Sequence, residues 1–425
     1  MASNDTRETL AILVGGGPAP GINGVIGSAT IEAVNRGLRV IGLLEGYRWL
    51  VKGDAAHTVE LGIKDVSRIH LIGGSILSTS RTNPAADPKG LQLAVDTLTK
   101  LGVRYLIGIG GDDTTFGSTK IAEQAKGRIS VATVPKTIDN DLPLPENVPT
   151  FGFETARATG TATIEALMED ARTTGRWYLA IAMGRRSGSL ALGMCKSAGA
   201  TLAVIPEEFK QEKLDLAVVA DVIAGAIIKR KATGREDGVA VISEGIGEAL
   251  DPDKIPTLKG LERDAYGHIR LSDLPLGTLL REQTANTLDQ LGVKATMVTK
   301  DIGYELRCAK PIPYDVEYTR TLGYGAVRYL LSGGSGALIS FSDGQIKPLT
   351  LNELLDPKTG RIRVRNVNVA SESYRVGRYY QIRIEASDLK EPSLARVAAV
   401  TKLSPQAFSD RFRPSLDQIV AFPEP

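Results

Sequence analysis

Apolar runs of strand length alternate with segments of helical spacing along most of the chain. Residues 10–14 and 39–44 are short and apolar, as strands are, and residues 22–35 between them carry apolar side chains at the spacing of a helix. This succession is one βαβ unit. Its repetition predicts an α/β fold in which mainly parallel sheets have helices on both faces.

The alternation continues to residue 331. Further strands are expected at residues 103–109, 129–134, 177–182, 201–205, 239–243 and 295–299. Further helices are expected at residues 89–101, 115–125, 155–171, 189–198, 214–229, 278–290 and 315–331. Residues 250–272 are charged and interrupted by glycines, which favours a loop. Beyond residue 333 the pattern changes to short β-rich pieces such as 337–341 and 361–364, which indicates an accessory layer of unassigned function.

The length of the chain predicts more than one domain. A chain of 425 residues exceeds the size at which a single hydrophobic core stops growing. Residues 142–150 contain three prolines and show no periodicity, which is typical of a crossing between domains.

The composition of the chain excludes several classes of protein. The 51 basic and 49 acidic side chains leave no strong net charge, so the electrostatic footprint of a nucleic-acid binder is missing. With only Cys195 and Cys308, the chain has neither a disulfide framework nor a cysteine-based zinc motif. Asp5 and Glu8 stand where a signal peptide needs basic and apolar residues, and the longest apolar stretch, 216–228, is too short for a bilayer. We expect a cytoplasmic protein without a membrane or nucleic-acid partner.

Two acidic loops follow strands of this pattern. Gly110-Gly111-Asp112-Asp113-Thr114 follows residues 103–109, and Thr137-Ile138-Asp139-Asn140-Asp141 follows residues 129–134. Ligands of open α/β sheets bind where the strands end. Close carboxylates there repel by about 4 kcal/mol at an effective dielectric of about 20, so Lys136 or a bound Mg²⁺ must balance them. The alternatives are a helix cap by Asp113 and an Asx-turn in the second loop.

Three further loops place polar groups at strand ends. Gly15-Gly16-Gly17 could cradle phosphate with its N–H groups, and a tight turn explains it equally well. Arg185 could bind an anion, although a solvated arginine explains that loop better when it is considered alone. Glu244 could accept sugar hydroxyl protons or cap a helix. The three histidines lie outside all of these loops, which leaves Ser–His and Cys–His chemistry without support and favours a carboxylate base.

Taken together, these motifs resemble those of the phosphofructokinase family. The likeness runs in order from about residue 10 to residue 342 and includes Ile205-Pro-Glu-Glu208, Gly303-Tyr-Glu-Leu-Arg307 and Pro311-Ile-Pro-Tyr-Asp315. It implies two Rossmann-like domains, an active site in the cleft between them, and a homodimer or homotetramer. It places a pyrophosphate- and Mg²⁺-binding α/β domain at residues 1–149 with 306–355, a fructose 6-phosphate-binding α/β domain at 150–305, and an accessory segment at 356–425.

Two positions indicate the pyrophosphate-dependent branch of that family. ATP-using members keep glycine where Asp113 stands and again where Lys136 stands. A carboxylate at position 113 would repel the α-phosphate of a nucleotide, and about 4 kcal/mol of repulsion corresponds to roughly a thousandfold in affinity. Lys136 would place a charge beside the transferring phosphoryl group. The implied reaction is reversible phosphoryl transfer from pyrophosphate to fructose 6-phosphate, which serves glycolysis and gluconeogenesis.

The resemblance also implies roles for single residues. Asp139 is the base that takes the proton from the 1-hydroxyl of the sugar phosphate, with Lys136 and Asp113 completing the catalytic set. Asp112 holds Mg²⁺, with Asp141 nearby. Gly17 and Arg81 contact the donor, and Arg176 matches an arginine that reaches into a neighbouring subunit's site. The residues implied to bind substrate are Thr137, Ile138, Asp139, Arg176, Met183, Gly184, Arg185, Glu244, Tyr304 and Arg307.

Two departures from the family and three alternatives accompany this reading. Val298 stands where relatives often have a basic residue, so Lys300 or Lys294 could replace it, and the Arg-Ser-Gly-Ser sequence after Arg185 leaves the fine sugar specificity open. The alternatives are an ATP-dependent kinase of the same fold, a non-catalytic sugar-phosphate sensor, and a lipid or NAD kinase that shares only the Gly-Gly-Asp loop.

Overall fold

The protein consists of two compact units, each formed from separate stretches of chain. The structure is a computed structural model that describes residues 6–145, 147–255, 258, 271–359 and 361–422. Unit 1 comprises Met1–Ala156 and Tyr304–Arg365, and unit 2 comprises Arg157–Gly303 and Asn366–Pro425. Most of the loop expected at 250–272 lies outside the described residues.

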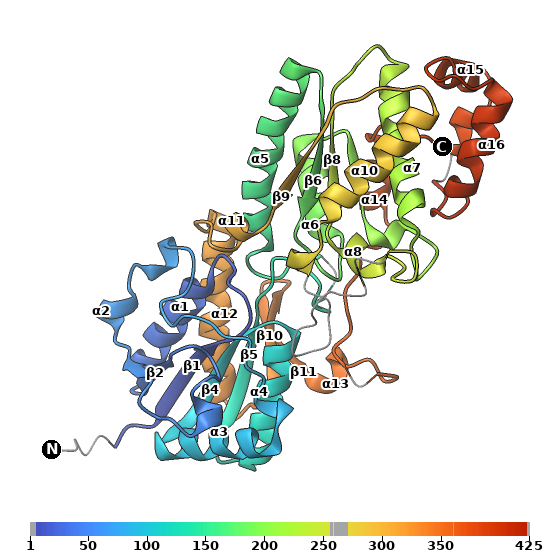
Figure 1. Ribbon diagram of the computed structural model, residues 1–425. Helices are drawn as coiled ribbons and strands as arrows, with labels where there is room; N and C mark the ends of the chain where they lie inside the picture. The colour runs from blue at the N-terminus through green and yellow to red at the C-terminus, as the bar shows by residue number, and fades with distance from the viewer. Residues whose placement is uncertain (1–5, 146, 256–257, 259–270, 360, 423–425) are drawn as a thin grey trace. The chain divides into compact units, whose positions relative to one another are not determined.

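Unit 1 is built on a seven-stranded sheet in the order β11-β10-β5-β4-β1-β2-β3 (Figure 1). Its strands are β1 (Thr9–Val14), β2 (Arg39–Leu43), β3 (Thr58–Glu60), β4 (Val103–Gly110), β5 (Ser130–Pro135), β10 (Ala337–Ser342) and β11 (Gln345–Thr350). The five inner strands are parallel, and β3 and β11 pair antiparallel at the two edges. The carboxyl ends of β1, β4 and β5 therefore meet at one edge of the sheet.

The two faces of this sheet bury separate cores. Leu10, Ile12 and Val14 of β1 pack in one core with apolar residues of α1 (Ile22–Asn35) and α12 (Pro313–Leu331). Ala11 and Leu13, which point to the opposite face, pack in the other core with α3 (Pro88–Lys100) and α4 (Asp112–Ala125). The continuous apolar sequence of β1 follows from this burial on both faces. The shorter helices of unit 1 are α2 (Ile63–Val66), α11 (Tyr304–Arg307) and α13 (Leu351–Leu354).

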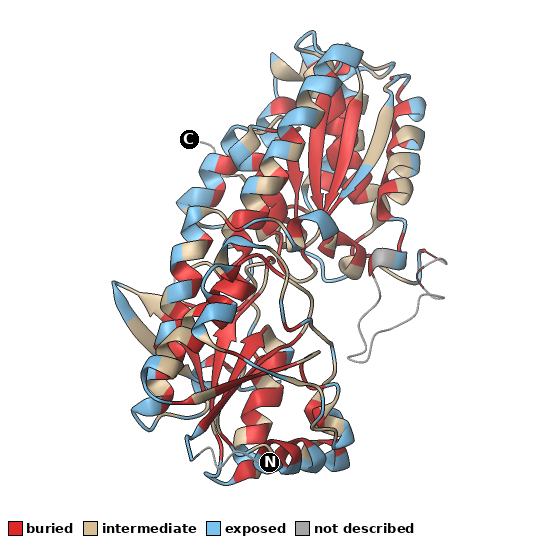
Figure 2. Cartoon of the chain, turned by 90° about the vertical axis from the view of Figure 1, so that its left-hand side faces the viewer, coloured by how far each residue is buried: buried red, intermediate tan, exposed pale blue. Residues whose placement is uncertain are grey.

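Unit 2 carries a four-stranded parallel sheet in the order β7-β8-β6-β9. Its strands are β6 (Trp177–Ala182), β7 (Leu202–Val204), β8 (Gly238–Ser243) and β9 (Met297–Ile302). The helices of its first stretch are α5 (Phe153–Thr174), in which the chain passes out of unit 1, α6 (Ser189–Ala198), α7 (Leu216–Lys231), α8 (Gly245–Ala249) and α10 (Leu276–Gln290). Figure 2 shows β6 and β8 buried along their whole length. Short 3₁₀ turns occur in both units at Leu50–Lys52, Ile69–Leu71, Pro84–Ala86, Pro206–Glu208, Leu271–Asp273 and Ala386–Leu389.

The C-terminal stretch of unit 2 is helical and shares the core of that unit. Its helices are α14 (Glu372–Tyr379), α15 (Ser393–Ala398) and α16 (Pro405–Leu416), and Phe408 and Phe412 pack among the apolar residues of α7. The buried side chains of Glu208 and Arg383 form an ion pair of 2.9 Å. Because removing one partner would leave a buried charge unpaired, this pair holds the C-terminal stretch to the rest of the unit.

The predicted elements up to residue 342 are confirmed, with ends that shift by three residues or fewer. One expectation for the tail is wrong. Residues 361–364 form no strand and make only one isolated bridge, between Leu355 and Ile362, and the regular elements that follow them in the described part of the tail are helical. Residues 356–425, expected as one accessory segment, divide between the two units. Across the part of the chain that is described, every helix is too short or too polar to cross a bilayer.

Candidate active site

The predicted donor loops begin at neighbouring, paired residues in the sheet of unit 1. Val14 of β1, Ile109 of β4 and Val134 of β5 are paired in register, so the glycine loop and the two acidic loops begin side by side. These loops follow the carboxyl ends of parallel strands, where open α/β sheets bind their ligands. The strand order thus brings together three loops that are far apart in sequence.

The glycine loop makes close backbone contacts that side chains would block. Gly15 donates to the carbonyl oxygen of Ile109 at 2.9 Å, and Gly16 donates to that of Ser80 at 2.8 Å. A Cβ added to Gly15 would lie 2.2 Å from the hydroxyl oxygen of Thr114, and Gly16 has a φ of +79°. The tight-turn explanation therefore accounts for Gly15 and Gly16. The contact between Gly16 and Ser80 also brings the neighbouring Arg81 to this loop.

Lys136 lies buried among charged groups at the end of β5. It is 5% exposed, and its Nζ donates a hydrogen bond to the carbonyl oxygen of Gly17. Burial, and then the positive charge of Arg307, lower the pKa of Lys136 to about 8, while the carboxylates of Asp139 and Asp112 act in the opposite direction. The charge of Arg81 also acts on Lys136, so the structure brings five predicted site residues into one electrostatic environment, namely Lys136, Arg307, Arg81, Asp139 and Asp112.

The first acidic loop is the start of a helix. α4 begins at Asp112 with Gly111 at its N-cap, so Asp113 does not cap a helix that opens at Thr115, and that alternative is wrong. Both aspartates lie in the first turn, where the helix dipole stabilises negative charge. The backbone N–H of Asp113 donates to Asp112 Oδ1 at 2.9 Å, and Asp113 is exposed. The carboxylate at 113 is thus exposed to solvent in the first turn of α4.

The second acidic loop is held by threonine and asparagine side chains. The Asp139 N–H donates to Thr137 Oγ1 at 3.1 Å, and the Thr150 hydroxyl donates to the Thr137 carbonyl oxygen at 2.7 Å. The Thr150 N–H donates to Asn140 Oδ1 at 3.1 Å. Ile138 is buried between the two ends of the turn. The loop around Asp139 is therefore a defined turn, and the residues that shape it, Asn140 and Thr150, are ones that the sequence patterns did not single out.

Arg307 and Tyr304 lie together in unit 1. The Arg307 guanidinium carbon is 5.3 Å from the centre of the Tyr304 ring and would lie 3.4 Å from a Cβ placed on Gly17. Tyr304 is 67% exposed. This contact places one predicted sugar-phosphate residue, Arg307, directly against the glycine loop and leaves Tyr304 accessible.

In unit 2 the loop after β6 is fixed by two glutamates. The Gly184 N–H donates to Glu244 Oε1 at 3.0 Å, and the Gly188 N–H donates to Glu207 Oε1 at 2.9 Å. Gly184 has a φ of +137°, which favours glycine. Arg185 Nε lies 3.7 Å from Glu248 Oε1. Glu244 thus holds the loop that carries Met183, Gly184 and Arg185. Glu207 also holds this loop, although the sequence motifs assign it no role.

Arg176 is not part of that cluster within unit 2. It precedes β6, whereas Met183 follows the same strand, so about 20 Å of extended chain separates them. The Nε of Arg176 lies 3.9 Å from Asp170 Oδ2 at the end of α5. Arg176 therefore lies at the opposite end of the strand from the loop that carries Arg185.

The acidic residues offer part of a magnesium site. Within the described ranges, no group of three or more His, Cys, Asp or Glu side chains is arranged to hold a metal ion. Mg²⁺ usually keeps several waters and is held by one or two carboxylates together with substrate phosphates. Asp112, beside Lys136 at the strand ends, provides a carboxylate of this kind, so these residues fit a metal that arrives with a phosphate ligand.

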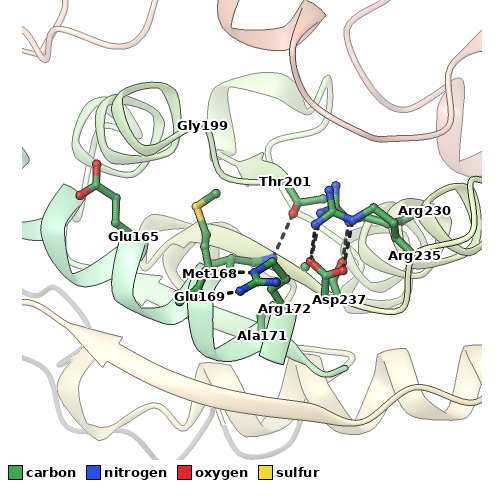
Figure 3. Close-up of a pocket in the computed structure, with 12 residues that line it drawn as sticks. Glu165, Met168, Glu169, Ala171, Arg172, Gly199, Thr201, Arg230, Arg235 and Asp237 are labelled. Atoms are coloured by element: carbon green, nitrogen blue, oxygen red, sulfur yellow. Dashed lines mark hydrogen bonds and ion pairs between the residues drawn. The ribbon is translucent and has the colours of Figure 1, made fainter. Parts of the chain in front are cut away.

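A cavity of about 370 Å³ lies elsewhere in unit 2 (Figure 3). Two of its arginines, Arg230 and Arg235, pair with Asp237 at 3.1 Å and 3.0 Å, and a third, Arg172, pairs with Glu169. None of the predicted site residues is among those that line it. The cavity is therefore separate from the candidate site.

Comparison with known proteins is consistent with the strand order and the loops. The phosphofructokinase family model matches residues 9–330. A relative from Thermotoga maritima, named pyrophosphate–fructose 6-phosphate 1-phosphotransferase, is 53% identical over 411 residues, which cover 95% of this chain and 98% of the relative. A relative of the same name from Naegleria fowleri is 48% identical and covers 95% of each chain.

The fold is also found among solved structures. The crystal structure of a pyrophosphate-dependent phosphofructokinase from Nitrosospira multiformis superposes with a TM-score of 0.66 at 15% identity and covers 93% of this chain and 92% of that chain. This likeness confirms the predicted α/β fold with mainly parallel sheets. The family match spans most of the chain, and the chain therefore belongs to the phosphofructokinase family.

Proposed function

We propose that the protein transfers a phosphoryl group from pyrophosphate to the 1-hydroxyl of D-fructose 6-phosphate, giving fructose 1,6-bisphosphate and phosphate. The observation that carries this proposal is the buried Lys136, which lies against Gly17 with the charges of Asp112 and Asp139 nearby. The relatives at 53% and 48% identity bear the name of this reaction. The reaction is reversible and serves glycolysis and gluconeogenesis.

Unit 1 supplies the charges for the donor. Lys136, Arg81 and Arg307 provide positive charge beside Gly17, where the pyrophosphate binds. Phosphoryl transfer leaves little covalent chemistry to the protein, so positioning and charge stabilisation supply most of the rate. A buried ammonium is stronger in this role than a solvated one, because the surrounding dielectric is low.

Asp139 acts as the general base. Its carboxylate takes the proton from the sugar 1-hydroxyl as that oxygen bonds to the phosphorus, and the bond from this phosphorus to the bridging oxygen of pyrophosphate breaks to release phosphate. A positioned base contributes about 10²–10⁴ to the rate of such a step. Thr137 and Ile138 flank Asp139 in the same turn. The residues proposed to bind the sugar phosphate are Met183, Gly184, Arg185, Glu244, Tyr304 and Arg307.

Asp112, with Asp141 nearby, would hold Mg²⁺ together with the donor phosphates, and the ion would supply positive charge that neutralises those phosphates. Arg176, at the other end of β6, reaches a neighbouring subunit in a homodimer or homotetramer. Residence in the cytoplasm stays a prediction.

The choice of donor tests this proposal. With Mg²⁺ and fructose 6-phosphate, the purified protein is expected to turn over with pyrophosphate and to show little turnover with ATP, because Asp113 repels the α-phosphate of a nucleotide. The assay measures fructose 1,6-bisphosphate with each donor in turn. Turnover with ATP alone would assign the protein to the ATP-dependent kinases, and turnover with neither donor would favour the non-catalytic sensor.

The lowered pKa of Lys136 predicts opposite effects of alkaline pH on catalysis and on stability. Above about pH 8 Lys136 loses its proton, so kcat/KM for pyrophosphate, which reports the free enzyme, is expected to fall. An unfolded lysine keeps its proton up to a pH of about 10.4. The unfolded chain therefore binds more protons between these values, and the contribution of Lys136 to the free energy of unfolding rises with pH. Rate profiles and denaturant titrations of the wild type and of Lys136→Met measure both trends, and profiles that coincide would contradict this assignment.

A further inference from the structure

Arg365 lies at a boundary of the fold and outside the part of the chain that the family model matches. It is the last residue of unit 1 before the chain enters the C-terminal stretch of unit 2, and the family match ends at residue 330. Its side chain is half-buried. A half-buried guanidinium needs hydrogen-bond acceptors for its several donors. Arg365 finds them in the loop of Asp139 and at Val148.

Three hydrogen bonds join Arg365 to that loop, and a fourth joins it to Val148. Its Nε donates to the carbonyl oxygen of Asn140 at 3.0 Å, and its Nη1 donates to that of Val148 at 2.7 Å. Its Nη2 donates to Asn140 Oδ1. Its backbone N–H donates to the carbonyl oxygen of Asp141 at 2.8 Å. One residue thus ties the turn that holds Asp139 to the far end of the proline-rich run that follows it.

The conformation of the loop depends on these bonds. Asn140 has a φ of +58°, a conformation that few residues other than glycine and asparagine adopt readily. Its side-chain oxygen accepts from both Thr150 and Arg365. The negative charge of Asp141 also acts on Arg365. Charge-assisted bonds of this kind are stronger than neutral ones, so the guanidinium fixes a turn that would otherwise have several conformations available.

We infer that Arg365 is a positioning residue, which holds the loop 137–141 so that the Asp139 carboxylate stays aligned with the sugar hydroxyl. The inference rests on the proposed function. Arg365 is not among the residues proposed to bind the substrates, so its removal should affect the chemical step and leave substrate binding largely unchanged. A misplacement of about 1 Å at a reacting group can cost about a hundredfold in rate.

Arg365→Met tests the inference, because methionine keeps much of the length and removes every side-chain donor. The expected result is a fall in kcat of about 10- to 100-fold, with KM for fructose 6-phosphate and for pyrophosphate within about threefold of the wild type. Arg365→Lys keeps the charge but cannot reach three acceptors at once, so it should recover part of the rate. Amide hydrogen exchange of residues 137–150 should become faster in Arg365→Met.

Arg363→Met is the matched control. Arg363 lies two residues earlier in the same unit, is exposed, and donates to the carbonyl oxygen of Glu353 instead. This variant should keep the wild-type kcat and the wild-type exchange of the loop. Equal losses of kcat in both variants, or a kcat within twofold of the wild type in Arg365→Met, would overturn the inference.

If Arg365→Met does not fold, Asn140→Gly carries the test. Glycine accepts the positive φ and removes the side-chain oxygen that receives the Arg365 bond. The same fall in kcat with retained KM is expected, and an unchanged kcat would overturn the inference. A wild type without turnover would overturn the proposed function and this inference with it, whereas an active wild type with unaffected variants would overturn the inference alone.

Discussion

Asp139→Asn is expected to lower kcat by about 10²–10⁴-fold while sugar-phosphate binding is retained. The amide has nearly the shape of the carboxylate but cannot take a proton from the 1-hydroxyl. The turn should survive the change, because its bond from residue 139 is made by the backbone N–H to Thr137. Steady-state kinetics with pyrophosphate, together with direct titration of fructose 6-phosphate, measure the two effects separately.

Asp141→Asn is the comparison for this variant, since it removes the same charge from the same loop two residues away. Its effect is expected to be smaller, because Asp141 is assigned only to the surroundings of the metal. Equal losses in the two variants would show that the charge of the loop, rather than proton transfer at 139, matters. A kcat of Asp139→Asn within tenfold of the wild type would rule out Asp139 as the base.

The double variant Asp113→Gly with Lys136→Gly is expected to lower kcat/KM for pyrophosphate by about 10²–10³-fold, the usual loss when one preorganised charge is removed from a reacting centre. Most of this loss should come from Lys136, which is buried against Gly17. Asp113 is exposed, and solvent screens its field, so about 4 kcal/mol is an upper limit for its repulsion of a nucleotide. Nucleotide affinity, measured by titration with ATP, should therefore rise by less than a thousandfold.

Lys120→Met is the control for this pair, because Lys120 lies on α4 but is paired with Glu123 at the surface. It should keep the wild-type kcat/KM for pyrophosphate. Wild-type kinetics in the double variant would show that Asp113 and Lys136 contribute nothing to turnover with pyrophosphate. The donor assignment would then rest on the relatives alone.

The sheet and the loops of the donor side could be predicted because their signals are local. Each of these loops follows a short apolar run that ends at a glycine or a charged residue, namely Gly15, Gly110 or Lys136. All three runs are confirmed as strands. α4 begins three residues before the expected start, because the two consecutive aspartates occupy the first turn of the helix instead of the loop before it.

The C-terminal helices were missed although one of them carries a clear signal. Ser404 accepts from the N–H of Ala407, and Pro405 takes the first helical position, which is a common start of a helix. The contact of Arg365 with Asn140 could not be predicted in the same way. The two residues are separated by 225 positions, and neither hydrophobic periodicity nor turn chemistry links positions so far apart.

The pairing of β10 with β5 has a consequence for how the protein is made. About 200 residues, which include all the strands of unit 2, leave the ribosome after β5 and before β10, and at ~5–20 residues per second this takes about 10–40 s. Throughout that time the nascent chain carries an unpaired strand edge, which is a template for aggregation. Translation speed and chaperones that act on nascent chains should therefore affect the yield of this protein.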